Sequence, residues 1–222
     1  VAAHLGSLFA VVFYFRKDFR SILVSGFAPI FKLNYVEENF RLFWFIVLAS
    51  LPVLIAGFLF RDIISYYFRN PLLISFSTIF FGLLLWLSDV IGKQQRSINS
   101  INKKDALIIG LLQVLAFIPG ASRSGITMTA GLMLGLDRNT AVKFSFFISV
   151  PIILAAALYE ASNLIQVGND IDIFNFIITV ILSALSSFFT IHLFLKFLDR
   201  IGMLPFVIYR LILGTILLFM FV

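Results

Sequence analysis

The sequence contains no cysteine, only 2 histidines and little charge. Without cysteine, neither a disulfide framework nor a thiolate metal site can form. Only 13% of the 222 residues are charged, which is about half the share found in an ordinary soluble domain. The scarcity of charge therefore excludes a typical soluble protein.

Apolar residues make up 61% of the chain, with 28 Phe, and they occur in long runs. A transmembrane helix needs about 20 mostly apolar residues. The runs predict about six such helices, at 1–15 (partial), 42–60, 71–91, 140–160, 172–196 and 203–222. We therefore predict an all-α polytopic membrane protein that forms a single integral membrane domain over residues 1–222.

The net charge of +6 is distributed unevenly along these predicted spans. Thirteen Lys and Arg residues fall on one side of the membrane, five of them in the first loop, and Arg61 and Arg69 fall on the other. Because basic loops remain in the cytoplasm, the basic side is cytoplasmic and the C-terminus lies outside. The excess charge thus indicates membrane topology and not nucleic-acid binding.

Two basic residues, Arg123 and Arg210, remain inside apolar runs. Arg210 lies far from either end of the last run, so its side chain cannot easily reach the membrane surface. We predict that Arg210 faces the interior of the helix bundle, pairs with backbone carbonyls or an acid, and has a structural role.

Residues 105–136 form a further apolar region, which is interrupted by Pro119, Gly120 and Gly125. Two full spans need about 40 residues, and this region has 32. We therefore predict a re-entrant helix pair at 105–117 and 125–136, with Asp105 as the first N-cap. Irregular backbone at membrane depth occurs only where protein buries it or where it lines a wet cavity.

The loop of this pair concentrates groups that bind anions. Gly120 and Gly125 permit positive φ and close backbone approach, and Arg123 is a forked cation suited to phosphate oxygens. The second helix directs its first N–H groups and its positive dipole end into the loop. The hydroxyl donors are Ser122, Ser124 and Thr127. The alternative is a structural kink, but this density of polar groups favours a cradle for phosphate or diphosphate.

The 11 acidic residues lie almost entirely in loops or at the ends of predicted spans. No pair of carboxylates shares one helical face inside the membrane. The sequence therefore shows neither a carboxylate metal site nor a convincing general base.

Three segments resemble, in order, the bacterial undecaprenyl-diphosphatase family linked to bacitracin resistance. The central one, Gln113 to Glu160, reads QVLAFIPGASRSGITMTAGLMLGLDRNTAVKFSFFISVPIILAAALYE and contains the family pattern PGxSRSGxT. The others are HLGSLFAVVFYFRKD, from His4 to Asp18, and LPFVIYRLILG, from Leu204 to Gly214. The similarity spans essentially the whole chain.

The resemblance implies an enzyme that removes one phosphate from undecaprenyl diphosphate and so recycles the lipid carrier for peptidoglycan synthesis. It implies action at the outer face of the bacterial plasma (inner) membrane, with Mg²⁺ or Ca²⁺ as cofactor. The expected partners are the polyprenyl diphosphate lipid, the bilayer and, as a homodimer, a second copy of the chain. The implied site residues are Ser122, Arg123, Ser124 and Thr127 for catalysis, and Gly120, Arg123 and Gly125 for substrate binding.

The family fold is an inverted repeat with two re-entrant pairs, and this chain shows only the second. The resemblance places the first pair, with its Glu-rich motif and its Ser-Ser-Thr-Gly-His loop, before Val1. The chain begins without Met inside an apolar run, so we expect an N-terminal truncation. We expect the cation ligands to lie outside this chain and residues 1–222 alone to be inactive.

Three other functions are alternatives to this interpretation, and the sequence alone excludes the last of them. A lipid-phosphate transporter or flippase would use the same broken-helix anion site, and phosphate release by the enzyme discriminates between them. A non-catalytic scaffold would tolerate the loss of Arg123. An acid-phosphatase-like lipid phosphatase needs a His soon after the Ser-Arg pair, and residues 124–136 contain none.

Overall fold

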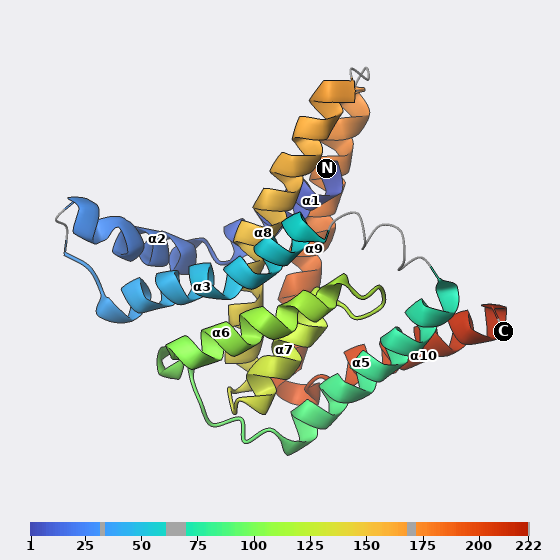
Figure 1. Cartoon of the computed structure of the whole chain (residues 1–222). Helices are drawn as coiled ribbons and strands as arrows, with labels where there is room; N and C mark the ends of the chain where they lie inside the picture. Colours follow the sequence, from blue (N-terminus) through green and yellow to red (C-terminus); the bar gives the residue numbers. More distant parts are fainter. Residues whose placement is uncertain (32–33, 61–69, 168–171, 222) are drawn as a thin grey trace. The chain divides into compact units, whose positions relative to one another are not determined.

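The computed structural model describes residues 1–31, 34–60, 70–167 and 172–221, and these are mainly helical (Figure 1). Lys32, which is one of the five basic residues of the first loop, lies outside the described residues, as do Arg61 and Arg69. The main helices are α1 (Ala2–Tyr14), α2 (Arg16–Phe31), α3 (Glu37–Leu59), α5 (Pro71–Ile91), α6 (Lys103–Leu112), α7 (Arg123–Met133), α8 (Arg138–Val167), α9 (Ile173–Ile201) and α10 (Leu204–Phe221).

Within the described residues, five helices are long and apolar enough to cross a membrane. They are α3, α5, α8 over Arg138–Ser162, α9 over Ile173–Leu198, and α10. Their positions confirm the predicted spans from 42–60 to 203–222 and the all-α polytopic membrane class. The predicted partial span 1–15 corresponds to α1, which has 13 residues. The inverted-repeat architecture and the single-domain organisation stay predictions.

The expectation of a loop between the first two spans is wrong, because this segment contains α2. Its buried residues include Phe19, Ile22 and Gly26, a spacing that places them on one helical face. The Phe19 ring packs on Phe147 with centroids 5.1 Å apart, and Gly26 lies against the Phe43 ring. The predicted spans do not include this helix, because its apolar run, Ile22 to Phe31, is shorter than the about 20 residues that a span needs.

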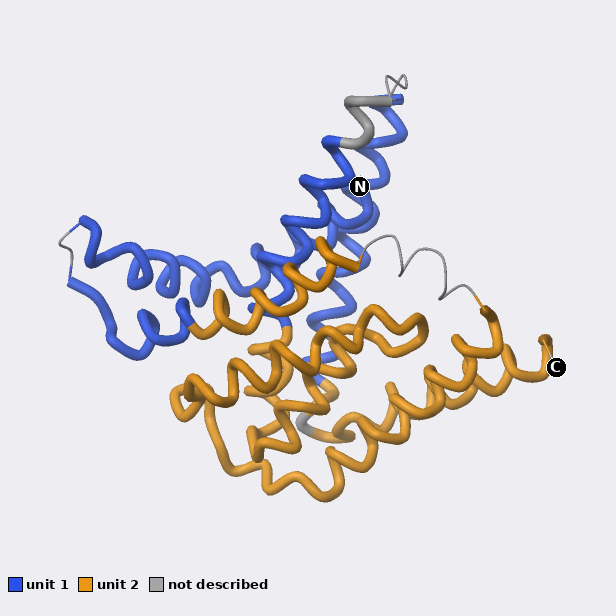
Figure 2. The backbone as a smooth tube through the Cα atoms, viewed as in Figure 1, with its two compact units in different colours: residues 1–44, 146–196 blue, residues 45–145, 197–222 orange. Residues whose placement is uncertain are grey.

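The chain divides into two compact units, residues 1–44 with 146–196 and residues 45–145 with 197–222 (Figure 2). In the first unit, α1 packs against α9 through small residues and hydroxyls. The Ser7 hydroxyl lies 3.0 Å from that of Ser187, and Ser183 donates to the Ala3 carbonyl at 2.7 Å. Such close contacts are typical of helix pairs in membranes.

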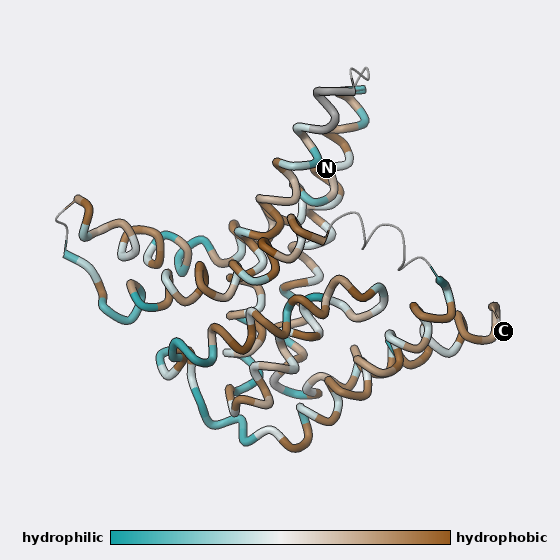
Figure 3. Tube along the Cα trace, in the orientation of Figure 1, coloured by the Kyte–Doolittle hydropathy of each residue, from teal (hydrophilic) through white to brown (hydrophobic). Residues whose placement is uncertain are grey.

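In the second unit, α5 and α10 lie side by side, and both are predominantly apolar (Figures 1 and 3). Asn70 caps α5 by accepting from the Leu72 N–H at 2.9 Å, and Pro71 occupies the first helical position, where it removes no helical hydrogen bond. On α10, a Cβ added to Gly214 would lie 2.6 Å from Ile79. The glycine thus lets the two helices approach closely.

The interrupted region consists of α6, the short 3₁₀ helix η2 (Gln113–Phe117), a loop and α7. Because α6 has 10 residues and α7 has 11, each is about 15–17 Å long, well short of the ~30 Å hydrocarbon core. This confirms two short helices instead of two spans. The N-cap of α6 is Asn102 and not Asp105, because the pair forms a capping box with Asp105 in the third helical position.

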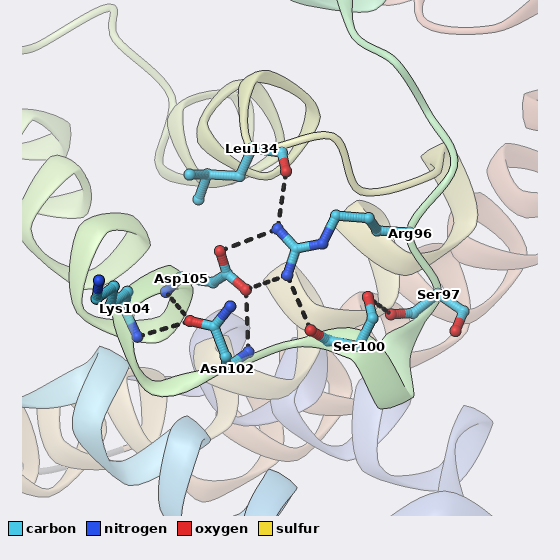
Figure 4. Close-up of polar contacts among 7 residues, drawn as sticks. All are labelled: Arg96, Ser97, Ser100, Asn102, Lys104, Asp105 and Leu134. Carbon is cyan, nitrogen blue, oxygen red and sulfur yellow. Dashed lines mark hydrogen bonds and ion pairs between the residues drawn. The ribbon is translucent and has the colours of Figure 1, made fainter.

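Arg96 joins the start of α6 to the end of α7 through hydrogen bonds (Figure 4). Its guanidinium donates to both carboxylate oxygens of Asp105, at 3.1 and 2.5 Å, and to the Leu134 carbonyl at 2.8 Å. The hydrogen bonds to the buried Asp105 raise the pKa of Arg96 above its ordinary value. The start of α6 and the end of α7 are therefore fixed by one side chain.

A second ion pair joins the end of α5 to the start of α8 in the same unit. Arg138 donates to the two carboxylate oxygens of Asp89 at 2.6 and 3.1 Å. Asp89 also accepts from the Met203 N–H at 3.1 Å, just before α10. Both ion pairs lie in segments that the charge pattern assigns to the cytoplasmic side.

Candidate functional site

The loop of residues 118–122 joins η2 to α7, and its last residue caps that helix. The helix begins at Arg123, two residues earlier than predicted. Ser122 is its N-cap and accepts from the Gly125 N–H at 3.3 Å, a contact that satisfies one N–H of the first turn. The Ser-Arg-Ser-Gly sequence thus forms the cap and first turn of α7.

Positive φ angles occur at two positions of this loop, and one differs from expectation. Gly120 has φ 87° as predicted, but the second positive φ, 65°, belongs to Ser122. Gly125 lies inside the first turn of α7 without positive φ, and what it provides is close approach, because an added Cβ would lie 2.8 Å from Arg210 Nη1. Positive φ is unusual for a residue with a side chain and is frequent at functional sites.

The loop is packed tightly against α5. Ser77 donates to the Pro119 carbonyl, and a Cβ added to Gly120 would lie 2.6 Å from the Thr78 hydroxyl oxygen. The buried side chains of Ala121 and Ile126 pack with Phe81 of α5. This packing leaves little freedom for the backbone that precedes α7.

The side chain of Arg210, on α10, contacts the loop and binds its backbone carbonyls. Its guanidinium donates to the Gly120 carbonyl at 2.6 Å and the Ala121 carbonyl at 2.9 Å. It also donates to the Thr78 carbonyl of α5 at 3.3 and 3.4 Å. The side chain is 6% exposed. The prediction that Arg210 faces the interior and pairs with carbonyls is confirmed.

The predicted hydroxyl donors occupy different environments. Ser122 is exposed and Ser124 is half-buried, and their hydroxyl oxygens lie 3.4 Å apart. Arg123, between them, is also half-buried. These three residues are adjacent on the first turn of α7, so the structure brings the predicted Ser-Arg-Ser group together.

Thr127 differs from these residues because it is 2% exposed and its hydroxyl contacts other parts of the protein. The hydroxyl lies 2.7 Å from that of Ser145 on α8 and 3.1 Å from the carbonyls of Arg123 and Ser124. Its geometry is that of a residue that fixes the first turn of α7 against α8. Sequence reasoning gave no role to Ser145, and the distance along the chain left no signal for this pair.

The charge around the loop is positive. Residues 106–136 contain no Asp or Glu, whereas Arg123 and Arg210 each carry a full charge. Among the described residues, no three His, Cys, Asp or Glu side chains lie together as a metal site would require. The donors around the loop are N–H, guanidinium and hydroxyl groups, which suit an anion and do not fit a divalent cation.

Comparisons with known proteins agree with this chemistry. Residues 1–216 match the family described as "Bacitracin resistance protein BacA". The chain is 48% identical to "Undecaprenyl-diphosphatase 2" of Stutzerimonas stutzeri (strain A1501), over 100% of the chain and 83% of that protein. It is also 48% identical to "Undecaprenyl-diphosphatase 1" of Pseudoalteromonas translucida (strain TAC 125), over 97% of the chain and 80% of that protein.

Proposed function

The chain belongs to the bacitracin resistance protein BacA family, and from that premise we propose that it hydrolyses undecaprenyl diphosphate. The products are undecaprenyl phosphate, which is the lipid carrier used for peptidoglycan synthesis, and inorganic phosphate. Water supplies the oxygen of the new P–O bond, and the phosphoanhydride bond breaks. The observation that carries the proposal is the Ser122-Arg123-Ser124 group at the start of a short membrane helix.

In this proposal, the first turn of α7 binds the diphosphate. The Arg123 guanidinium provides two parallel donors to phosphate oxygens, and the N-terminal end of α7 favours negative charge. Ser122 accepts from the Gly125 N–H, and its own O–H remains a donor. Ser124 is the other hydroxyl donor of this turn.

The remaining predicted site residues support this turn instead of facing the substrate. Thr127 fixes the turn through Ser145, and Gly120 allows the loop to pack on α5. Gly125 keeps the first turn close to Arg210. Ser122, Arg123 and Ser124 thus bind and orient the substrate, and we assign the activation of water to none of the predicted site residues.

The divalent cation implied by the family resemblance is a separate part of the proposal. Since the residues around the loop do not fit such an ion, we derive no step through it and assign none of its ligands to this loop. We further propose that the protein acts in the bacterial plasma membrane with its site toward the outer face. A homodimer stays a prediction.

The proposal is tested with Arg123→Ala in the full-length protein, by measuring phosphate release from undecaprenyl diphosphate in detergent. Loss of a preorganised donor to developing charge costs about 2–4 kcal/mol, so kcat/KM is expected to fall about 30- to 1,000-fold. Arg123→Lys should recover part of the activity, because a lysine keeps the charge but not the fork.

Arg20→Ala is the matched control, because Arg20 is exposed on α2. It should leave kcat/KM within about twofold, as expected for a surface substitution. Unchanged activity in Arg123→Ala would remove the basis of the proposal. Lipid transport without phosphate release by the unsubstituted protein would instead favour the flippase alternative.

A further inference from the structure

We infer that Arg210 is a positioning residue for the reaction, acting through the backbone of the 118–122 loop. Its guanidinium fixes the Gly120 and Ala121 carbonyls and so sets the direction in which the loop and the first turn of α7 present their donors. The inference rests on the proposed function of that turn. It adds a role for a residue on another helix, 87 positions after Arg123.

The burial of Arg210 determines which groups must surround its charge. A cation that is 6% exposed inside an apolar helix pair is costly unless protein groups replace its water. Among the described residues, the partners of its guanidinium are the carbonyls of Thr78, Gly120 and Ala121. These carbonyls solvate the charge without cancelling it, so a positive charge remains beneath the loop.

The geometry of the peptide bond links this contact to substrate binding. In a trans peptide, the C=O and N–H groups point in opposite directions. Because the Ala121 carbonyl points to Arg210, the N–H of Ser122 in the same peptide points away from Arg210. The positive φ at Ser122 then turns the chain into α7. Arg210 therefore holds the Gly120 and Ala121 carbonyls on its own side of the loop and the Ser122 N–H on the opposite side, at the start of the helix.

Two glycines match the space that Arg210 occupies. A Cβ added to Gly125 would lie 2.8 Å from the Arg210 Nη1 atom, and one added to Gly82 on α5 would lie 3.3 Å from the Arg210 Cβ. A contact below 3.0 Å requires the neighbouring group to move. The glycine of the Ser-Arg-Ser-Gly sequence is thus explained by a side chain from α10.

The test compares Arg210→Met, Arg210→Lys, Gly125→Ala and the double variant Arg210→Lys/Gly125→Ala in the full-length protein. Undecaprenyl diphosphate hydrolysis is measured together with thermal unfolding, so that activity is expressed per folded protein. Arg138→Met is the control, because it removes an arginine from an ion pair with Asp89 in the same unit. It should lower stability and leave kcat/KM of the folded protein within about twofold.

We expect Arg210→Met to lower kcat/KM about 100-fold, mainly in kcat, since misplaced donors stabilise the transition state poorly. Arg210→Lys should lose about 10-fold, because an ammonium cannot span the carbonyls in a fixed fork. If Arg210 acts through the turn that contains Gly125, the losses of kcat/KM in Arg210→Lys and in Gly125→Ala should not multiply in the double variant, because groups in contact are coupled.

Two results would overturn the inference: Arg210→Met retaining kcat/KM within about threefold, or losses that multiply in the double variant. If Arg210→Met does not fold, Arg210→Lys and Gly125→Ala decide the question through their coupling. Inactive Arg123→Ala combined with fully active Arg210→Met would refute this inference and leave the proposed function intact. Active Arg123→Ala would instead refute the proposed function.

Discussion

Gly120→Ala should damage both the stability and the activity of this protein, because two separate costs meet at that position. An alanine at φ 87° loses about 1–2 kcal/mol through clash with its own backbone. Its Cβ would also lie 2.5 Å from the Ile74 carbonyl oxygen and 2.6 Å from the Thr78 hydroxyl oxygen. Overpacking of this kind costs about 1–3 kcal/mol, so the sum is about 2–5 kcal/mol.

The overlap between the added Cβ and the Ile74 carbonyl should also displace the loop, because this carbonyl belongs to helix α5 and cannot easily move. A shift of the loop by a fraction of an ångström displaces the donors of α7, and kcat/KM should fall at least about 10-fold. The assays are thermal unfolding in detergent and phosphate release from undecaprenyl diphosphate.

Gly135→Ala provides a matched control. Gly135 has φ 82°, but the nearest atoms to an added Cβ are 3.6 and 3.9 Å away, which are ordinary contacts. This variant should therefore show the conformational cost of about 1–2 kcal/mol alone and retain its activity. Equal losses in stability and activity for the two variants would refute the packing of the loop on α5.

Substitutions at two further positions test the cap of α7 and the contacts by which Arg96 joins the start of α6 to the end of α7. Ser122→Ala should lower stability by about 1 kcal/mol through loss of the N-cap and also reduce kcat/KM. Ser122→Asn should restore stability without restoring full activity, and equal activities would argue against the hydroxyl as a donor. Arg96→Met should lower stability by about 1–3 kcal/mol, because the buried Asp105 loses its guanidinium partner; an unchanged unfolding temperature would contradict the contacts seen in Figure 4.

The local features of the fold could be predicted because neighbouring residues determine them. The long apolar runs predicted the spans, since length and hydropathy decide whether a helix can cross the bilayer. Asn102 and Asp105 contain a capping signal in their spacing alone, although either residue type can serve as an N-cap and Asp105 was the wrong choice. Helix α2 was not predicted because its apolar run, Ile22 to Phe31, is too short for a span.

The candidate site was predictable in its chemistry and not in its geometry. The Ser122-Arg123-Ser124 sequence by itself indicates an anion site, because a glycine-rich break and a cation coincide within a few residues. The contact between the Thr127 hydroxyl and Ser145 could not be predicted, because it depends on how α7 packs against α8. For the same reason, the conformation of Ser122 was not predictable from a motif that contains two glycines.

Arg123 and Arg210 together show what each level of structure decided. The sequence alone determined that both are cations in apolar surroundings and that Arg123 lies in a break of the helix. It also determined that Arg123 lies within the family pattern PGxSRSGxT. Only the tertiary structure decided that Arg210 binds the carbonyls of that same break. The physical reason is that a buried guanidinium must find acceptors in space, and the docking of α10 against α5 determines which acceptors it meets.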